Sequence, residues 1–308
     1  MGDLTPRPEV TTGSSQNTGL PVAVITGASS GIGAAAAERL AMLGHHVVLI
    51  GRDPDRLEHV VHRVAGVTGR TPDAYRADFA VLDEVRALGR RLRDRYPRID
   101  LLANNAGLMC HHRSGTVDSF EMTVQVNHLA GFLLSHLLLD NLRPGARLIG
   151  TTSAAERLGT VNPDDLSRSR HRYSKWQAYG ASKQANLLFT AEAARRWADP
   201  GIIPVCFHPG PVHTAFGRGN RLFEIGLRLP GFRSPEQGAD TLVWLATTPD
   251  VIAGRYYYRR RLKVPSRVAR DPVLAARLWE ASLDAVGLPR TADRSRSDGP
   301  RDLPGMAG

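Results

Sequence analysis

Short apolar runs and amphipathic helical segments alternate along most of this chain. The first strand is predicted at residues 22–25 and the first helix at 31–43, where apolar residues recur at helical spacing until Gly44. Further strands are predicted at 46–50, 73–77, 99–103, 147–151, 202–207 and 255–258, with helices near 53–64, 82–96, 119–139, 179–197 and 235–246. Because helical crossovers join such strands, the pattern predicts one doubly wound α/β domain, with a parallel sheet of about seven strands and helices on both faces.

The two ends of the chain differ from this pattern. Residues 1–20 are rich in Thr, Ser, Gly and Pro without the apolar core of a signal peptide, and residues 289–308 are polar. We therefore expect disordered tails on either side of a folded domain at 21–288. The richest apolar run, 129–139, is interrupted by His136 and is shorter than a membrane span. A cytoplasmic protein with no integral membrane segment is expected.

The formal net charge of +10 raises the question of a nucleic-acid partner. Lysine occurs at three positions only, and the arginines are scattered over the predicted helices and both tails. Because this distribution forms no binding stripe, we predict no nucleic-acid partner, and an Arg-rich nucleic-acid-binding protein stays an alternative. The one dense cluster is Arg259-Arg260-Arg261, which we interpret as a solvated strand end, with anion binding as the alternative.

A glycine-rich loop follows the first predicted strand. Residues 26–33 read TGASSGIG, a TGxxxGxG pattern at the junction of strand and helix. Glycine lets the backbone turn tightly and approach a pyrophosphate, and the next helix offers free N–H groups and a partial positive charge. Since open α/β sheets bind ligands at the carboxyl ends of their strands, the loop predicts a dinucleotide cofactor there.

The residues after the second predicted strand bear on the choice of dinucleotide. A cofactor with free ribose hydroxyls is usually met by an acid at this place. This chain has Gly51, which carries no carboxylate, and then Arg52, whose guanidinium can make a bidentate contact with a 2′-phosphate. We predict NADP(H) in preference to NAD(H), with a solvated arginine as the alternative reading of Arg52.

Tyr179 and Lys183 are four residues apart in a predicted helix and therefore lie on the same face. An ammonium about 4 Å from a phenol favours the phenolate by up to roughly 4 kcal/mol at an effective dielectric constant near 20. That energy corresponds to a pKa lowered by about three units from its usual value near 10. The pair therefore predicts a tyrosine that exchanges a proton near neutral pH. Alone, the same spacing also fits an ordinary surface pair.

The ordered motifs resemble those of the short-chain dehydrogenases/reductases. The resemblance extends from about residue 22 to 287 and rests on the glycine loop, Asp78, the 104–107 sequence NNAG, Asn127, Ser153, Tyr179 with Lys183, and Pro209-Gly210. Longer segments are similar to the retinol-dehydrogenase-like branch: 127–134 (NHLAGFLL), 182–189 (SKQANLLF), 234–239 (SPEQGA) and 276–280 (ARLWE). The resemblance implies a single Rossmann-fold catalytic domain.

The resemblance also implies a role for each site residue. Tyr179 would be the acid–base group, Lys183 would hydrogen-bond the nicotinamide ribose, and Ser153 would donate to the substrate oxygen. Asn127 would hold a water that connects Lys183 to solvent. Tyr173 is a rival for Tyr179, but Gln177 four residues beyond it supplies no charge. The implied cofactor-binding residues are Gly27, Ser29, Ser30, Gly31, Ile32, Gly33, Arg52, Asp78, Phe79, Asn105, Ala106, Gly107, Tyr179, Lys183, Pro209, Gly210, Val212 and Thr214.

Several of these residues also have ordinary structural readings. Asp78 would fit a helix N-cap, Asn127 would fit a polar residue that satisfies helix backbone, and Pro209-Gly210 would fit a simple turn. The 105–107 segment is expected to support the sheet as well as the cofactor. Four histidines have no spacing that suits zinc, so no metal is predicted: His111, His112, His128 and His208.

The expected function is hydride transfer between nicotinamide and a small-molecule alcohol or carbonyl compound. A substrate flap is expected at about 213–234, and its apolar residues favour a lipophilic substrate, with a small helix packed on the core as the alternative. Fold and family do not fix the substrate. A catalytically silent dinucleotide-binding sensor is the alternative function. A homodimer stays open beside a monomer.

Overall fold

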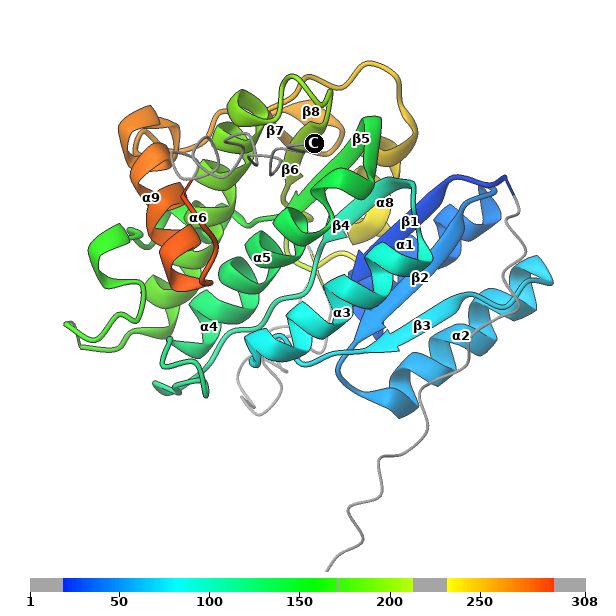
Figure 1. The fold of residues 1–308 in the computed structure, drawn as a ribbon, viewed down its shortest axis with the longest axis horizontal. Coiled ribbons are helices and arrows are strands. Elements are labelled where there is room, and N and C mark those ends of the chain that lie inside the picture. The colour runs from blue at the N-terminus through cyan, green and yellow to red at the C-terminus, as the bar shows by residue number, and fades with distance from the viewer. Residues whose placement is uncertain (1–18, 171, 213–231, 291–308) are drawn as a thin grey trace, which may run out of the picture.

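The computed structural model describes residues 19–170, 172–212 and 232–290, and an eight-stranded sheet runs through the middle of this part (Figure 1). The strands lie in the order β3-β2-β1-β4-β5-β6-β7-β8. They are β1 (Val22–Thr26), β2 (His46–Gly51), β3 (Asp73–Arg76), β4 (Ile99–Asn104), β5 (Leu142–Thr151), β6 (Ile203–Phe207), β7 (Tyr256–Tyr258) and β8 (Arg261–Leu262). Neighbouring strands from β3 to β7 are parallel, and β8 runs antiparallel to β7.

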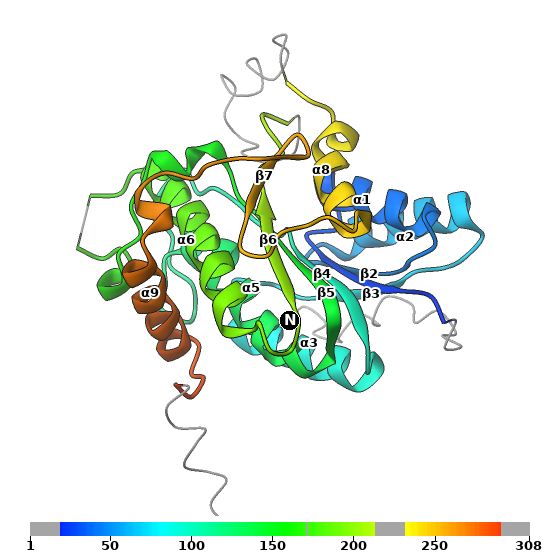
Figure 2. The same cartoon turned by 90° about the horizontal axis from the view of Figure 1, so that it is seen from above.

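Helices cover both faces of the sheet, which confirms the predicted doubly wound α/β fold (Figure 2). One face carries α1 (Gly31–Met42), α2 (Pro54–Thr68) and α8 (Pro235–Thr247), and the other carries α3 (Leu82–Arg95), α5 (Ala130–Leu137) and α6 (Lys175–Arg196). A further helix, α9 (Pro272–Ala285), packs on α6. Two apolar layers, one on each side of the sheet, form the core.

The start of α2 illustrates how the sequence sets an element's limits. Asp53 caps the helix by accepting a hydrogen bond from the Arg56 N–H, and Pro54 occupies the first helical position. Gly69, with a positive φ of 68°, ends the helix. The residues expected to point inward are buried: Leu57, Val60, Val61 and Val64.

The long helix predicted at 119–139 is wrong at its start and in its middle. Ser119 has a φ of 67°, which a helix does not accept, so the first turn is α4 (Met122–Val124). A π-helical segment, η1 (Gln125–Leu129), then separates α4 from α5. The part of the chain that the structure describes also contains four 3₁₀ turns: η2 (Leu139–Asn141), η3 (Ala154–Arg157), η4 (Pro163–Asp165) and η5 (Val268–Arg270).

Three further differences concern two elements that were not predicted and one strand that begins earlier than predicted. β8 and α9 were not predicted, and β5 begins at Leu142 rather than Arg147. The early part of β5 includes a Pro-Gly pair, and the pairing with β4 shifts register between Ile99 and Leu101. Most of the predicted tails at 1–20 and 289–308 and of the predicted flap at about 213–234 lies outside the described residues, namely 1–18, 291–308 and 213–231.

The strand order predicts a binding crevice at the carboxyl ends of two central strands, β1 and β4. β1 pairs with β2 on one side and with β4 on the other, so the winding reverses direction between β1 and β4. Such a switch point leaves a crevice at the carboxyl ends of the two strands. Among the described helices, none has the length and apolarity that crossing a membrane requires.

Candidate active site

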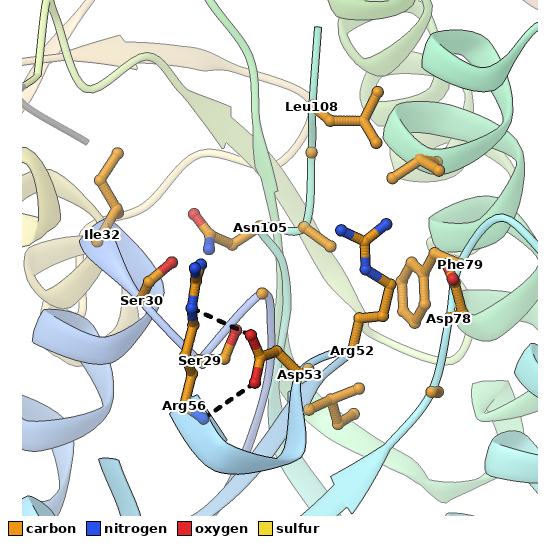
Figure 3. A pocket seen from close by; sticks show the side chains of 18 of the residues that line it. Ser29, Ser30, Ile32, Arg52, Asp53, Arg56, Asp78, Phe79, Asn105 and Leu108 are labelled. Carbon is orange, nitrogen blue, oxygen red and sulfur yellow. Dashed lines mark hydrogen bonds and ion pairs between the residues drawn. The ribbon is translucent and has the colours of Figure 1, made fainter. Parts of the chain in front are cut away.

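A pocket of about 540 Å³ opens at this switch point (Figure 3). Its lining includes most of the predicted cofactor-binding residues: Gly27, Ser29, Ser30, Gly31, Ile32, Arg52, Asp78, Phe79, Asn105, Ala106 and Gly107. Six other predicted residues that the structure describes lie outside this lining: Gly33, Tyr179, Lys183, Pro209, Gly210 and Val212. The structure therefore places one half of the predicted site in this pocket, and the other half has to be located separately.

The glycines of the 26–33 loop allow two backbone segments to touch. Gly27 has a φ of +67°, and a Cβ atom there would lie 2.8 Å from the Ala106 Cα atom. A Cβ atom at Gly33 would lie 2.2 Å from the Gly27 carbonyl oxygen. The Thr26 hydroxyl joins the same segments by accepting hydrogen bonds from the N–H groups of Asn105 (2.9 Å) and Ala106 (3.0 Å). Any side chain at these glycines would push the loop off β4.

The N-terminus of α1 faces the pocket with a first turn suited to an anion. Ser30 is the N-cap residue, yet its side chain makes no capping hydrogen bond, and the first turn of this described helix contains no acidic residue. The N–H groups of such a turn and the helix dipole favour negative charge. The residues present therefore fit the pyrophosphate of a dinucleotide.

Two arginines extend into the pocket from the end of β2 and the start of α2 (Figure 3). Arg52 was predicted, whereas Arg56 was missed, although its position in the first turn of α2 could have indicated it. Arg56 Nε lies 3.1 Å from Asp53 Oδ2. A Cβ atom at Gly51 would lie 2.9 Å from the Ser29 Cβ atom, so an acidic side chain does not fit there unless Ser29 moves.

Asp78 and Phe79 form another wall of the pocket. Asp78 Oδ1 accepts a hydrogen bond from the Ala80 N–H at 3.0 Å, which fixes the turn after β3. The alternative of an N-cap role is not seen, because α3 begins at Leu82, whose N–H donates to Asp118 Oδ2 at 2.9 Å. Asp78 is therefore a pocket residue.

The predicted catalytic residues come together beside this pocket. Tyr179 and Lys183 lie on α6, and Ser153 follows β5 and caps η3 by accepting a hydrogen bond from the Ala155 N–H at 3.2 Å. The Ser153 hydroxyl is hydrogen-bonded to the Tyr179 phenol. Lys183 Nζ donates to the Thr151 carbonyl oxygen at 3.1 Å and lies 5.4 Å from the centre of the Tyr179 ring.

The predicted lowering of the Tyr179 pKa is wrong. Burial raises the pKa of Tyr179 to about 12, and the hydrogen bond with Ser153 opposes this rise only in part. Burial also lowers the pKa of Lys183 to about 8. Both shifts have one cause, because a buried site favours the uncharged form of each group. Tyr179 is therefore a neutral phenol at pH 7.

Asn127 holds the loop after β4 against the catalytic residues. Its Oδ1 accepts from the Leu108 N–H at 2.7 Å, and its Nδ2 donates to the Leu108 carbonyl (2.9 Å) and to Ser182 Oγ (2.9 Å). A Cβ atom at Gly107 would lie 3.2 Å from Asn127 Oδ1 and 3.3 Å from Lys183 Nζ. Gly107 therefore connects the pocket lining to the catalytic group. The side chain of Asn127 binds loop backbone at Leu108 and a side chain at Ser182, so the alternative in which it satisfies helix backbone is not seen.

A pair of glycines that the sequence did not single out sets the spacing between Ser153 and Tyr179. A Cβ atom at Gly180 would lie 2.5 Å from the Ala155 carbonyl oxygen, and one at Gly159 would lie 2.2 Å from the Gln177 carbonyl oxygen. The segment that follows Ser153 therefore packs directly on the backbone of α6. The contact joins residues about twenty positions apart, so helical spacing gives no sign of it.

We expect Gly180→Ala to lower both activity and stability. The added methyl group meets backbone atoms, which cannot turn away as a flexible side chain can, so η3 and Ser153 must move off α6. The expected result is a free energy of unfolding reduced by about 1–3 kcal/mol, together with a fall in kcat. Urea unfolding and steady-state rates measure the two effects. Gly66→Ala is the matched control, since a Cβ atom at Gly66 on α2 meets open space; equal behaviour of the two variants would contradict this account.

The loop after β6 completes the site on its far side. Arg233 Nη1 donates to the Pro209 carbonyl oxygen at 2.9 Å, and the Gly210 N–H donates to His208 Nδ1 at 3.1 Å. A Cβ atom at Gly238 would meet both Val212 Cγ2 (2.9 Å) and Ile32 Cγ1 (3.1 Å), so the β6 loop lies against the start of α1. Thr214, also predicted here, lies outside the described residues.

Tyr173 and His128 have structural partners instead. The Tyr173 hydroxyl donates to the Cys110 carbonyl oxygen at 2.8 Å, and burial raises the pKa of Tyr173 to about 12. His128 is buried and contacts Ser282 Oγ through Nε2 at 3.0 Å. Within the described ranges, no three His, Cys, Asp or Glu side chains converge as a metal site would require.

Comparison with known proteins agrees with this site. Residues 21–224 match the family model for short chain dehydrogenases. A Streptomyces sp. (strain C5) protein named "Putative daunorubicin C-13 ketoreductase DnrU" is 55% identical over 273 residues, which cover 87% of this chain and 94% of that protein. Mouse retinol dehydrogenase 11 is 36% identical over 275 residues, 87% of each chain. A Burkholderia cenocepacia short chain dehydrogenase solved with NADP has a TM-score of 0.63 at 25% identity, covering 77% of this chain and 95% of that one.

The chain therefore belongs to the short-chain dehydrogenase/reductase family, and its curated relatives place it with the retinol-dehydrogenase-like members. It is an oxidoreductase that acts on a small-molecule alcohol or carbonyl compound with a nicotinamide cofactor.

Proposed function

We propose that this protein is an NADP(H)-dependent oxidoreductase for a lipophilic carbonyl or alcohol compound, with Ser153, Tyr179 and Lys183 as its catalytic residues. The observation that carries the proposal is the Ser153–Tyr179 hydrogen bond next to a buried Lys183, beside the pocket that contains the glycine loop. Relatives named for retinol and for daunorubicin support a large, lipophilic substrate.

Tyr179 supplies the proton. With a pKa of about 12 it carries its proton at pH 7, which is the form that donates to a carbonyl oxygen during reduction. Ser153 donates a hydrogen bond to the same oxygen, where negative charge develops. A nicotinamide bound in this site supplies or accepts the hydride.

Lys183 stabilises the charge that remains on Tyr179. After the proton has left, the phenolate lies close to an ammonium with a pKa of about 8, which is mostly charged at pH 7. Their attraction in a buried site favours proton release from the tyrosine. Asn127 positions the 107–108 loop beside Lys183 and, as the family resemblance implies, would hold a water near the ammonium.

A panel of aliphatic, aromatic and terpenoid aldehydes, ketones and alcohols, assayed with NADPH, NADH and their oxidised forms, tests the proposed function. We expect reduction of at least one carbonyl class with NADPH. Tight NADPH binding without turnover of any compound would contradict the proposal and favour a silent dinucleotide-binding sensor.

The preference for NADP(H) rests on Arg52, and it predicts the behaviour of Arg52→Ala. The guanidinium faces the pocket at the end of β2. The next residue, Asp53, also lines the pocket, but its carboxylate caps α2 and pairs with Arg56. Loss of one charge-assisted contact should weaken NADPH binding by about tenfold or more and leave NADH binding near its original value. Fluorescence titration with each cofactor measures both constants.

Arg63→Ala is the matched control for Arg52→Ala. Arg63 also lies on this side of the sheet but pairs with Glu38 and does not line the pocket. Equal losses of NADPH and NADH affinity in Arg52→Ala would contradict a 2′-phosphate contact.

A further inference from the structure

The β7–β8 hairpin carries a second cavity of about 540 Å³ that the proposed chemistry does not use. Its lining residues are Tyr258, Arg259, Arg261, Leu262 and Lys263. Arg259 and Lys263 lie around one aromatic ring, since the Arg259 Cζ atom is 5.2 Å and the Lys263 Nζ atom 4.9 Å from the centre of the Tyr258 ring. We call this cavity the basic pocket.

The basic pocket and the candidate active site both lie on the side of the sheet where the parallel strands have their carboxyl ends. Phe207 of β6 pairs with Tyr257 of β7, so the residues that follow these strands leave the sheet together. His208 stacks on Tyr258, with ring centres 4.0 Å apart and an angle of 9° between the ring planes. A Cβ atom at Gly210 would lie 3.6 Å from Tyr258 Cε2. The pocket therefore borders the loop predicted to hold the nicotinamide end of the cofactor.

The charges of the basic pocket are not balanced by acids. Across residues 19–170, 172–212 and 232–290, no carboxylate forms an ion pair with Arg259, Arg261 or Lys263. Arg260 lies in the same turn but is turned towards Asp240, which it binds through its Nε atom at 2.8 Å. Burial and the neighbouring cations Lys263, Arg233 and Arg259 lower the pKa of His208 to about 4, so the histidine adds no charge at pH 7 but reports a positive field.

The two residues in the turn of the hairpin, Arg259 and Arg260, are not the residue types that favour its backbone conformation. Arg259 and Arg260 have φ values of 49° and 62°, and Tyr258 pairs with Arg261 across the turn. A two-residue turn with two positive φ values favours Asn-Gly, because arginine is strained in this conformation. The arginines are therefore present at a cost to the turn, which points to a role for their charge.

From this geometry we infer that the basic pocket binds an anionic group, a carboxylate or a phosphate, carried by the substrate. The inference rests on the proposed function, because it places the reacting carbonyl at Tyr179 and the anionic end of the same molecule at the hairpin. Guanidinium groups recognise both anions through paired N–H donors, so the shared chemistry is a planar or tetrahedral oxyanion.

Matched aldehydes test the inference. We would measure kcat/KM with NADPH for 4-formylbenzoate, for its neutral methyl ester and for 4-formylphenyl phosphate. At low ionic strength the wild-type protein should prefer at least one anionic aldehyde over the ester by about tenfold or more, and added salt should reduce the ratio. The two anionic aldehydes show whether a carboxylate or a phosphate is preferred.

The variants separate charge from folding. Arg259→Asn combined with Arg261→Gln should bring the ratio close to one, whereas Arg260→Gln in the same turn should keep it. Arg259→Asn alone should lower the ratio and raise the melting temperature, because asparagine relieves the strained backbone. A merely structural arginine would lower the melting temperature instead.

Two results would overturn the inference while the proposed function stands: a wild-type ratio near one, or a ratio that the double variant leaves unchanged. Binding of phosphatidylglycerol vesicles that depends on Arg259 and Arg261, without any aldehyde preference, would likewise overturn it in favour of a lipid surface. If none of the three aldehydes is reduced, calorimetric titration of 4-formylbenzoate into wild type and double variant decides on the anion site by itself, and the wider carbonyl panel decides on the proposed function.

Discussion

Replacing Tyr179 with phenylalanine is expected to lower kcat/KM for carbonyl reduction by about 10³-fold and to leave NADPH binding intact. The substitution removes only the hydroxyl group, which is the proton donor in the proposed reaction and the hydrogen-bond partner of Ser153. The ring stays in place beside Lys183, so the pocket and the glycine loop keep their shape. Steady-state rates and NADPH fluorescence titration on the same preparation measure the two quantities.

Tyr173→Phe provides the control for this prediction. Its hydroxyl donates to a backbone carbonyl, and its ring lies outside the lining of the cofactor pocket, so activity should stay near the wild-type value. Wild-type turnover in Tyr179→Phe, or a comparable loss in Tyr173→Phe, would show that the proton comes from another group.

Replacing Lys183 with methionine is expected to abolish activity and to stabilise the fold. Lys183 is 2% exposed, and burial lowers its pKa from 10.5 to about 8. A shift of this size means that the folded state holds the charged lysine at a cost of about 3 kcal/mol at pH 7. Methionine has a similar length without the charge, and the Thr151 carbonyl keeps a hydrogen bond from Asn186 Nδ2. The free energy of unfolding should therefore rise by up to about 3 kcal/mol.

The pH dependence of stability gives this prediction a sign that can be checked. Between pH 8 and 10.5 the unfolded chain still binds the lysine proton and the folded protein has released it, so wild-type stability rises with pH in this window. Lys183→Met should lack that rise. Urea unfolding at pH 7 and pH 10 measures both proteins, and a variant that is less stable than wild type at pH 7 would contradict the buried-charge account.

The sequence predicted the fold well because alternation is a local property. Most strands and helices up to β6 could be recognised from the spacing of their apolar residues. Asp53 and Pro54 marked the start of α2, and Gly69 marked its end. The strand β8 and the helix α9 were missed because two residues leave no strand period and because no further strand follows to suggest a crossover.

The candidate site was predicted less evenly, for physical reasons. Motif order brought Ser153, Tyr179 and Lys183 to one place, but the direction of the tyrosine pKa shift depends on burial, which helical spacing does not reveal. The contact of Gly159 with Gly180 joins two segments that come together only in the folded chain. Arg56 could have been indicated by its position in the first turn of a predicted helix, whereas the contacts of Arg259 and Lys263 with the Tyr258 ring depend on the β7–β8 turn, which the sequence did not predict.

The residues that line the cofactor pocket lie at the carboxyl ends of the strands, and this asymmetry has a practical use. At the opposite end the helices return to the sheet through short turns such as 43–45, 69–72 and 96–98. Gly44 and Gly69 in these turns have positive φ values and open space around them. A dye or an immobilisation tether attached in these turns, at a residue other than the two glycines, would be separated from the reacting groups by the length of the strands. The enzyme could then be fixed to a support with its cofactor pocket facing the solution.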